Sequence, residues 1–224
     1  MFRKDKIDSE VISMLQEAQA IQHYLQYLGQ KYIAPHKALD EEEFMLQFKQ
    51  DGGKARNQFK KIVEAFNDQQ NLLKMQRVSN WMNQAQFGTP LFYCFFRGEN
   101  DEMSYPGMAV RLYIEGQRLG LTWEVSVLER TLAKDSLARQ RQVLTVPSND
   151  AMYYLAFSQG EPFIYSGTED NRIFLKKAVD VGEVRKVLVK SLIGFFDEFQ
   201  TMDDLIEAMN QQFERLFPYY LATK

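Results

Sequence analysis

The chain has 224 residues, of which 45% are hydrophobic and 13% aromatic, and it carries a formal net charge of -3. This composition supplies enough apolar surface for a packed core and excludes a wholly disordered chain. The negative net charge argues against a protein that coats nucleic acid through its overall charge, while leaving room for a local basic face.

The only cysteine of the sequence, Cys94, cannot form an internal disulfide, so a reducing compartment is predicted. The N-terminal residues lack the apolar core of a secretory signal. No apolar run approaches the ~20 residues that a membrane helix requires. We therefore expect a soluble, cytoplasmic protein that makes no membrane contact.

Helical periodicity dominates the first part of the chain. Apolar residues at helical spacing predict a long amphipathic helix over Ile7–Ile33, which Pro35 ends. A second helix is expected over Leu39–Gln50, and the sequence Asp51-Gly52-Gly53 is expected to break it. A third helical region is predicted from Lys54 to about Asn83, with a polar middle that allows a further break.

The pattern changes to strands after Pro90. The aromatic run Leu91–Phe96 is typical of a buried strand. Two alternating runs, Met108–Ile114 and Arg118–Val125, flank a pair that contains Gly116 and predict a β-hairpin, because glycine accepts the positive φ of a tight turn. One face of this hairpin is apolar. The mixed opposite face carries Arg111, Tyr113, Arg118, Thr122 and Glu124. If helices cover only the apolar side, the mixed face is exposed and is the place to look for binding. If helices cover both sides, Arg111 and Glu124 must find partners, and the hairpin is part of the core.

Strands and helices are expected in the rest of the chain. A helix is predicted over Glu129–Gln142, and three strands over Ala151–Phe157, Phe163–Tyr165 and Arg172–Lys176. Two helices are then expected. The first is marked by apolar residues from Val184 to Phe196, and the second begins at Thr201, whose hydroxyl suits an N-cap, and is closed by Pro218.

This order of elements indicates an α+β fold. Helices come first, a mostly antiparallel sheet with the hairpin Met108–Val125 at its centre follows, and helices end the chain. Near Phe87 the spacing of apolar residues changes from helical to strand-like. This change predicts a helical N-terminal region, residues 1–86, and a sheet-centred α+β domain, residues 87–224. One continuous domain is the alternative.

The sequence favours a protein without catalytic residues or cofactors. It lacks the motifs of serine hydrolases, zinc enzymes and P-loop enzymes, and its two histidines, His23 and His36, do not have metal-ligand spacing. Clustered carboxylates in two loops leave a metal-dependent hydrolase open, although carboxylates are also common in solvated turns. The residues of these two loops are Glu99, Asp101 and Glu102, and Glu169 and Asp170.

Basic residues gather in two segments. The first contains Arg130, Lys134, Arg139 and Arg141, and the second contains Arg172, Lys176, Lys177, Arg185, Lys186 and Lys190. Such runs are usually solvated helix faces. If the two segments converge, they could neutralise phosphates while strand aromatics stack on bases. The candidate nucleic-acid or ligand face then consists of Arg111, Arg118, Trp123, Arg130, Arg139, Arg141, Tyr153, Tyr165, Arg172, Lys176 and Lys177.

Three segments, Gly88–Phe96, Tyr105–Ile114 and Gln117–Trp123, resemble the strand order of McrB-like N-terminal domains. The expected closing helix Met202–Phe217, with its Pro-Tyr-Tyr end, is also similar to the end of that family. These domains are the DNA-reading modules of modification-dependent restriction systems, and an aromatic pocket in them holds a flipped modified base. The resemblance implies DNA as a ligand, but no motif assigns that pocket to particular residues of this chain.

Three functions follow from the sequence. The favoured one is a non-catalytic binding module of unknown ligand that acts with a protein partner or by self-association through its N-terminal helix. The first alternative is a nucleic-acid binding domain, for modified DNA among others, and the second is the metal-dependent hydrolase.

Overall fold

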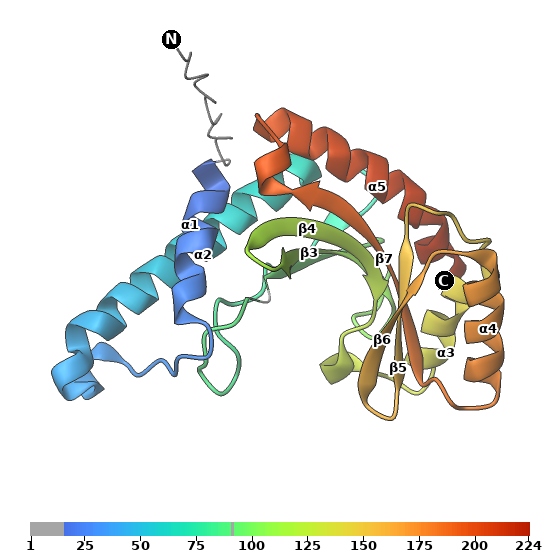
Figure 1. Ribbon diagram of the computed structural model, residues 1–224, viewed down its shortest axis with the longest axis horizontal. Helices are drawn as coiled ribbons and strands as arrows, with labels where there is room; N and C mark the ends of the chain where they lie inside the picture. The colour runs from blue at the N-terminus through green and yellow to red at the C-terminus, as the bar shows by residue number, and fades with distance from the viewer. Residues whose placement is uncertain (1–15, 91) are drawn as a thin grey trace, which may run out of the picture.

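A computed structural model describes residues 16–90 and 92–224, which form an α+β fold around one antiparallel sheet (Figure 1). The strands are β1 (Lys74–Met75), β2 (Tyr93–Arg97), β3 (Gly107–Glu115), β4 (Arg118–Ser126), β5 (Tyr153–Ser158), β6 (Glu161–Ser166) and β7 (Lys186–Phe195). They lie in the order β1-β2-β3-β4-β7-β5-β6. The α-helices are α1 (Gln16–Tyr24), α2 (Glu42–Asn67), α3 (Ser136–Arg141), α4 (Glu169–Asp180) and α5 (Met202–Ala222).

The predicted hairpin is confirmed as the centre of this sheet. Strands β3 and β4 pair antiparallel, with Val110 opposite Trp123 and Glu115 opposite Arg118. Gly116 lies in the turn at a φ of 59°, which is the left-handed conformation that favours glycine. Because β7 pairs with the other side of β4, both hairpin strands are interior strands of the sheet.

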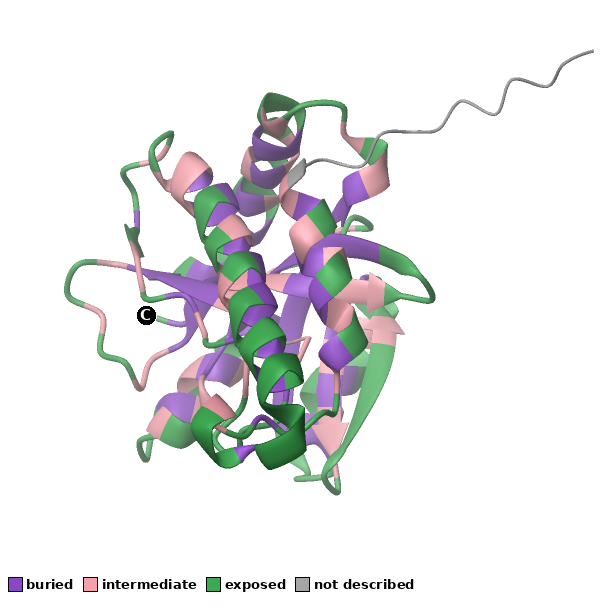
Figure 2. Cartoon of the chain, turned by 90° about the vertical axis from the view of Figure 1, so that its left-hand side faces the viewer, coloured by how far each residue is buried: buried purple, intermediate pink, exposed green. Residues whose placement is uncertain are grey.

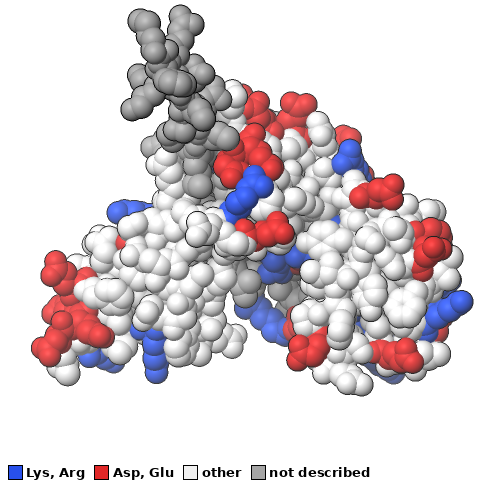
Figure 3. Space-filling model, viewed as in Figure 1, with Lys and Arg blue, Asp and Glu red and all other residues white. Residues whose placement is uncertain are grey.

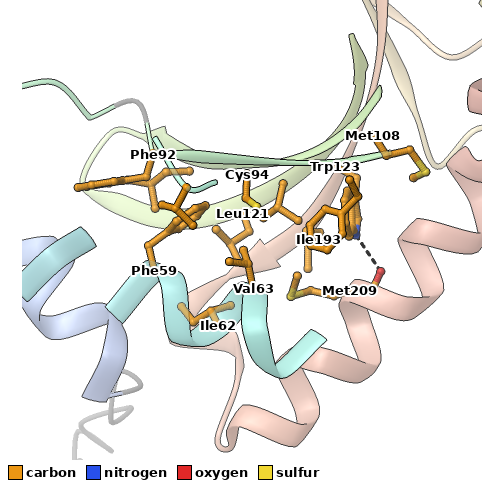
Figure 4. Packing of buried hydrophobic residues seen from close by; sticks show 14 of the residues in the cluster. Phe59, Ile62, Val63, Phe92, Cys94, Met108, Leu121, Trp123, Ile193 and Met209 are labelled. Atoms are coloured by element: carbon orange, nitrogen blue, oxygen red, sulfur yellow. Dashed lines mark hydrogen bonds between the residues drawn. The ribbon is translucent and has the colours of Figure 1, made fainter. Parts of the chain in front are cut away.

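Two helices, α2 and α5, pack against one face of the sheet. The indole Nε1 of Trp123 donates a hydrogen bond of 2.9 Å to the backbone oxygen of Met209 in α5. The rings of Phe66 in α2 and Phe213 in α5 lie 5.1 and 5.5 Å from that of Trp123. Figure 4 shows the two helices in contact with the sheet, with side chains of α2 and α5 pointing toward those of the strands.

The buried apolar side chains form one cluster that includes residues of α1, α2, the sheet and α5. Along the helices in Figure 2, exposed and buried residues alternate in bands, as expected for amphipathic helices with one side on a core. The cluster therefore contains residues from both of the regions that the sequence predicted. Within the described residues, no helix has the length and apolar character needed to cross a membrane.

The predicted helix break at Asp51-Gly52-Gly53 is wrong, because α2 continues through these residues. Asp51 is buried and accepts hydrogen bonds from the Tyr27 hydroxyl and from Gln47, each at 2.9 Å. Gly52 lies against Trp81, so closely that a Cβ atom there would be 2.5 Å from the indole Cδ2. The glycine pair therefore does not end the helix. Gly52 is instead the position at which α2 packs closely against Trp81.

The first and third predicted helices are shorter than expected. Within the described residues, α1 gives way at Tyr24 to a 3-10 turn over Leu25–Tyr27, and residues 7–15 of the prediction lie outside the described residues. The third helical region ends at Asn67. Beyond it, the side chain of Gln70 accepts hydrogen bonds from the backbone of Leu72 and Leu73, which turns the chain toward β1.

In the second half, two predictions are wrong and two hold only in part. The expected strand Arg172–Lys176 lies inside α4, which Thr168 caps by accepting a hydrogen bond from the backbone of Asn171. The expected helix between Val184 and Phe196 is the strand β7, which is buried on both faces. The expected helix over Glu129–Gln142 is a 3-10 turn, a loop and the short α3, and α5 continues past Pro218 to Ala222.

The two glycines of α2 provide a matched test of the packing. We expect Gly52→Ala to lower the free energy of unfolding by about 1–3 kcal/mol, because the new methyl group would overlap the Trp81 ring. Gly53→Ala meets no atom within 4 Å. It should raise that free energy by about 0.5–1 kcal/mol, since alanine is the better helix former. Urea denaturation of both variants measures the difference, and equal effects would contradict the described contact.

Candidate binding surface on the concave sheet face

The face of the sheet opposite α2 and α5 is concave. Strands β3 and β4 are curved and lie between the part containing α1 and α2 and the part containing β5 and β6 (Figure 1). The space-filling view shows a hollow between these two parts, with Lys and Arg side chains inside it and many Asp and Glu side chains on the outer rim (Figure 3). The helices cover the apolar side of the hairpin, and the mixed side faces the hollow.

A row of aromatic and charged side chains crosses five strands of the concave face. Tyr93 in β2 is opposite Arg111 in β3, and Lys190 in β7 is opposite both Glu124 in β4 and Tyr153 in β5. These five residues are called the concave ladder below. The Arg111 guanidinium lies 4.9 Å from the centre of the Tyr93 ring, and its Nη2 lies 2.7 Å from Glu124 Oε1. The Lys190 ammonium lies 3.3 Å from the other carboxylate oxygen.

Glu124 is the electrostatic centre of the ladder. Its side chain is only 1% exposed, and it also accepts a hydrogen bond of 2.8 Å from the Ser126 hydroxyl. Burial opposes ionisation of Glu124, but attraction to Arg111 and Lys190, together with these hydrogen bonds, outweighs it and lowers the pKa to about 2. The carboxylate is therefore ionised at neutral pH, and the ladder carries a net charge of +1.

A cavity of about 540 Å³ adjoins the β2 end of the ladder. Tyr93 and Phe95 line it from the sheet, Met103 from a loop and Arg130 from the 3-10 turn Glu129–Thr131. The segment 76–84 supplies Arg77 and several amide side chains. Arg77 and Arg130 are both exposed, and within the described residues neither has an acidic partner. Because Tyr93 belongs to the cavity and also contacts Arg111, the cavity and the ladder form one continuous surface.

The structure places four of the eleven members of the predicted nucleic-acid or ligand face on or beside this surface. Arg111 and Tyr153 lie in the ladder, and Arg130 lies at the cavity. Arg118 lies at the rim, where it stacks on Phe195 at 3.9 Å and pairs with acidic residues that follow β7.

Other predicted residues lie elsewhere. Trp123 is fully buried beneath α5, which removes it from any surface that a ligand could contact. Tyr165 lies on the helix-covered face, where its ring is 5.7 Å from that of Phe174 in α4. Arg139 pairs with Asp135, and Arg172 pairs with Glu169. The remaining members of the predicted face are Arg141 and Lys176, which line a second cavity, and Lys177, which is exposed on α4.

Three of the five acidic loop residues have roles within the fold. Asp101 accepts hydrogen bonds from the backbone of Gly98, from the Tyr220 hydroxyl and from Lys224. Glu99 pairs with Lys74, and Glu169 lies in the first turn of α4. Throughout residues 16–90 and 92–224, no three His, Cys, Asp or Glu side chains are grouped so that they could hold a metal ion.

The lone cysteine has the surroundings of a core residue. Cys94 is fully buried on the helix-covered face, and its thiol donates to the backbone oxygen of Gln76 at 3.1 Å. Burial raises the pKa of this thiol to about 12, so it is protonated at neutral pH and is a poor nucleophile.

Sequence reasoning missed part of this surface. Tyr93 lies in an aromatic run whose residues all look buried in the sequence. No polar residue beside it indicates that its side of the strand faces solvent. Lys190 was placed in a helix, which separated it from Glu124. Arg77 belongs to a segment that is predicted to be helical but is an irregular chain along the cavity.

Comparison of the chain with protein-family models, curated proteins and solved structures finds no match in any of the three.

The buried carboxylate predicts how stability depends on pH. Since the folded pKa of Glu124 is about 2 and its ordinary value is 4.5, its ionised form contributes stability that is present above pH 4.5 and is lost as the pH falls toward 2. The contribution is about 3 kcal/mol. We expect Glu124→Gln to be less stable than the wild type at pH 7 and to lose less stability between pH 5 and pH 2.

Denaturant unfolding across that pH range measures both effects. Glu161→Gln, at an exposed position of the edge strand β6, makes the same change of charge and should retain the wild-type pH dependence. A Glu124→Gln variant whose stability falls with acid as steeply as that of the wild type would contradict the assigned role.

Proposed function

We propose that the protein is a non-catalytic binding module that holds a single-stranded segment of nucleic acid on the concave face of its sheet. The observation that carries this proposal is the concave ladder, in which the aromatic rings of Tyr93 and Tyr153 lie at the two ends and the charged side chains of Arg111, Glu124 and Lys190 lie between them. Aromatic rings provide stacking surfaces for bases, and a cationic groove follows a phosphate backbone. The curved sheet holds both kinds of group on rigid strands.

The distribution of charge supports an anionic ligand at this surface. Arg118, Arg139 and Arg172 are neutralised by acidic partners. Arg77 and Arg130, beside the cavity, have none among the described residues. These two guanidinium groups are therefore available to phosphates beside the hollow, although the net charge of the chain is negative. The likeness to McrB-like domains favours DNA over RNA as the natural ligand.

The chemistry of the surface favours binding over catalysis. Glu124 is the carboxylate of the ladder, and a pKa near 2 makes it a weak general base at neutral pH. Its two oxygens are already occupied by Arg111, Lys190 and Ser126. Its role is thus to fix the positions of Arg111, which is partly exposed on this face, and of Lys190, which is buried beside it.

Binding to labelled single-stranded DNA should weaken steeply as salt is added, because phosphate contacts release counterions. We expect Arg77→Gln and Arg130→Gln each to weaken binding and to reduce the slope of log K against log salt by about 0.7–1, the value for one lost phosphate contact. Lys177→Gln, which removes an exposed cation from α4, should leave the slope unchanged. Fluorescence anisotropy measures these slopes, and affinity that does not depend on salt would contradict the proposal.

The aromatic contribution can be separated from the ionic one. Tyr93→Leu should weaken binding by about 1–3 kcal/mol, the usual contribution of one stacked base, without changing the salt slope. Tyr165→Leu removes a ring from the opposite face of the sheet and should leave the affinity unchanged. The same anisotropy assay decides between the two faces, since equal losses in both variants would show that the concave face has no special role.

A further inference from the structure

A second, smaller cavity lies between α3 with the 3-10 turn that follows it, Gln142–Thr145, and α4. Its volume is about 250 Å³. Arg141 lines it from the end of α3, and Lys176 lines it from α4, so each predicted basic segment contributes one residue to it. In Figure 1, α3 and α4 lie beside each other at the β5 and β6 end of the molecule. None of its lining residues belongs to the larger cavity beside the concave ladder.

The walls of this cavity are anchored to the sheet and to each other. The Gln140 amide in α3 is fully buried and donates hydrogen bonds of 3.0 and 2.9 Å to the backbone oxygens of Val125 in β4 and Val187 in β7. Arg172 in α4 donates to the backbone oxygen of Leu144 in the 3-10 turn. The two walls are thereby fixed relative to each other, which is what a preformed binding site needs.

One cationic side chain of the lining has an unsatisfied donor. The Nε atom of Arg141 is buried and has no hydrogen-bond partner within the described residues. Such atoms call for an explanation, of which a missing ion is one, and Arg97 has two further donors of this kind away from the cavity. Lys176 likewise has no acidic partner in the part of the chain that the structure describes. Two cationic groups therefore border one small cavity, and one of them has a donor with no partner.

The remaining lining limits the class of ligand. Ala138, Leu144 and Val179 make part of the wall apolar, and Asp180 is its one carboxylate. The charged lining has a net charge of +1, which suits a small anion better than a polyanion. The volume is below the roughly 300–1,000 Å³ of pockets for drug-sized ligands, so the cavity suits a small ligand.

We infer that this cavity binds a small organic oxyanion, with its charged oxygens at Arg141 and Lys176 and a short apolar group against Leu144 and Val179. A carboxylate and a phosphate monoester share this chemistry. An arginine fork and an ammonium group both donate strong, charge-assisted hydrogen bonds to such oxygens. The site is independent of the proposed nucleic-acid surface, because the two cavities share no lining residue.

Calorimetric titration of the full chain with inorganic phosphate, methyl phosphate and butyrate tests this inference. We expect saturable binding of at least one probe that carries a methyl or alkyl group, and tighter binding of methyl phosphate than of inorganic phosphate. Arg141→Gln and Lys176→Gln should each weaken binding about tenfold or more, which corresponds to the loss of a charge-assisted hydrogen bond. Asp180→Asn should strengthen it, because the substitution removes a repulsive charge.

One variant serves as the control. Lys177→Gln changes the neighbouring residue of α4, which does not line the cavity, and it should retain wild-type binding. Circular dichroism of each variant verifies that the fold is retained, and Arg141→Lys provides a milder change at the same position. Lack of saturable binding with all three probes, or binding that is the same in Arg141→Gln as in the wild type, would overturn the inference.

Discussion

The interaction on which the surface depends is the contact of buried Glu124 with Arg111 and Lys190. It joins side chains of β3, β4 and β7 at the centre of the sheet. A buried carboxylate is costly unless cations and hydrogen bonds compensate for its lost hydration, and Glu124 has both. Removing either cation would leave the charge of Glu124 less compensated. The contact therefore keeps two cations on this face and holds them in fixed positions.

This constraint explains why the two faces of the sheet differ. The face with Trp123 is apolar, so α2 and α5 cover it and its aromatic rings form the core. The concave face carries ionised groups whose partners lie within the sheet, and an apolar helix packed there would desolvate them further. The hollow thus contains rings and cations held by strands, which position groups more accurately than loops do. A binding surface of this kind is already formed before its ligand arrives.

Sequence reasoning succeeded where a pattern was local and failed where a contact was distant. Alternation along the hairpin correctly gave its pairing and placed Arg111 and Glu124 on the mixed face. Strand β7 was predicted as a helix because a strand that is buried on both faces has a nearly continuous apolar run, whose spacing also fits a helix. Lys190 was therefore assigned to the wrong element, and its contact with Glu124 could not be foreseen. Gly52 looked like a break because its partner Trp81 lies far along the chain.

The central claim is that the concave face, with Tyr93 and Tyr153, is the surface that contacts nucleic acid. Photochemical crosslinking to single-stranded DNA with iodinated bases, followed by mass spectrometry of the crosslinked peptides, tests this claim most directly, because aromatic side chains stacked on the base react preferentially. The account predicts crosslinks at Tyr93, Tyr153 or both, with no crosslink at Tyr165 on the helix-covered face. Crosslinks confined to Tyr165 and α4, or none at all with DNA in saturating amounts, would contradict it.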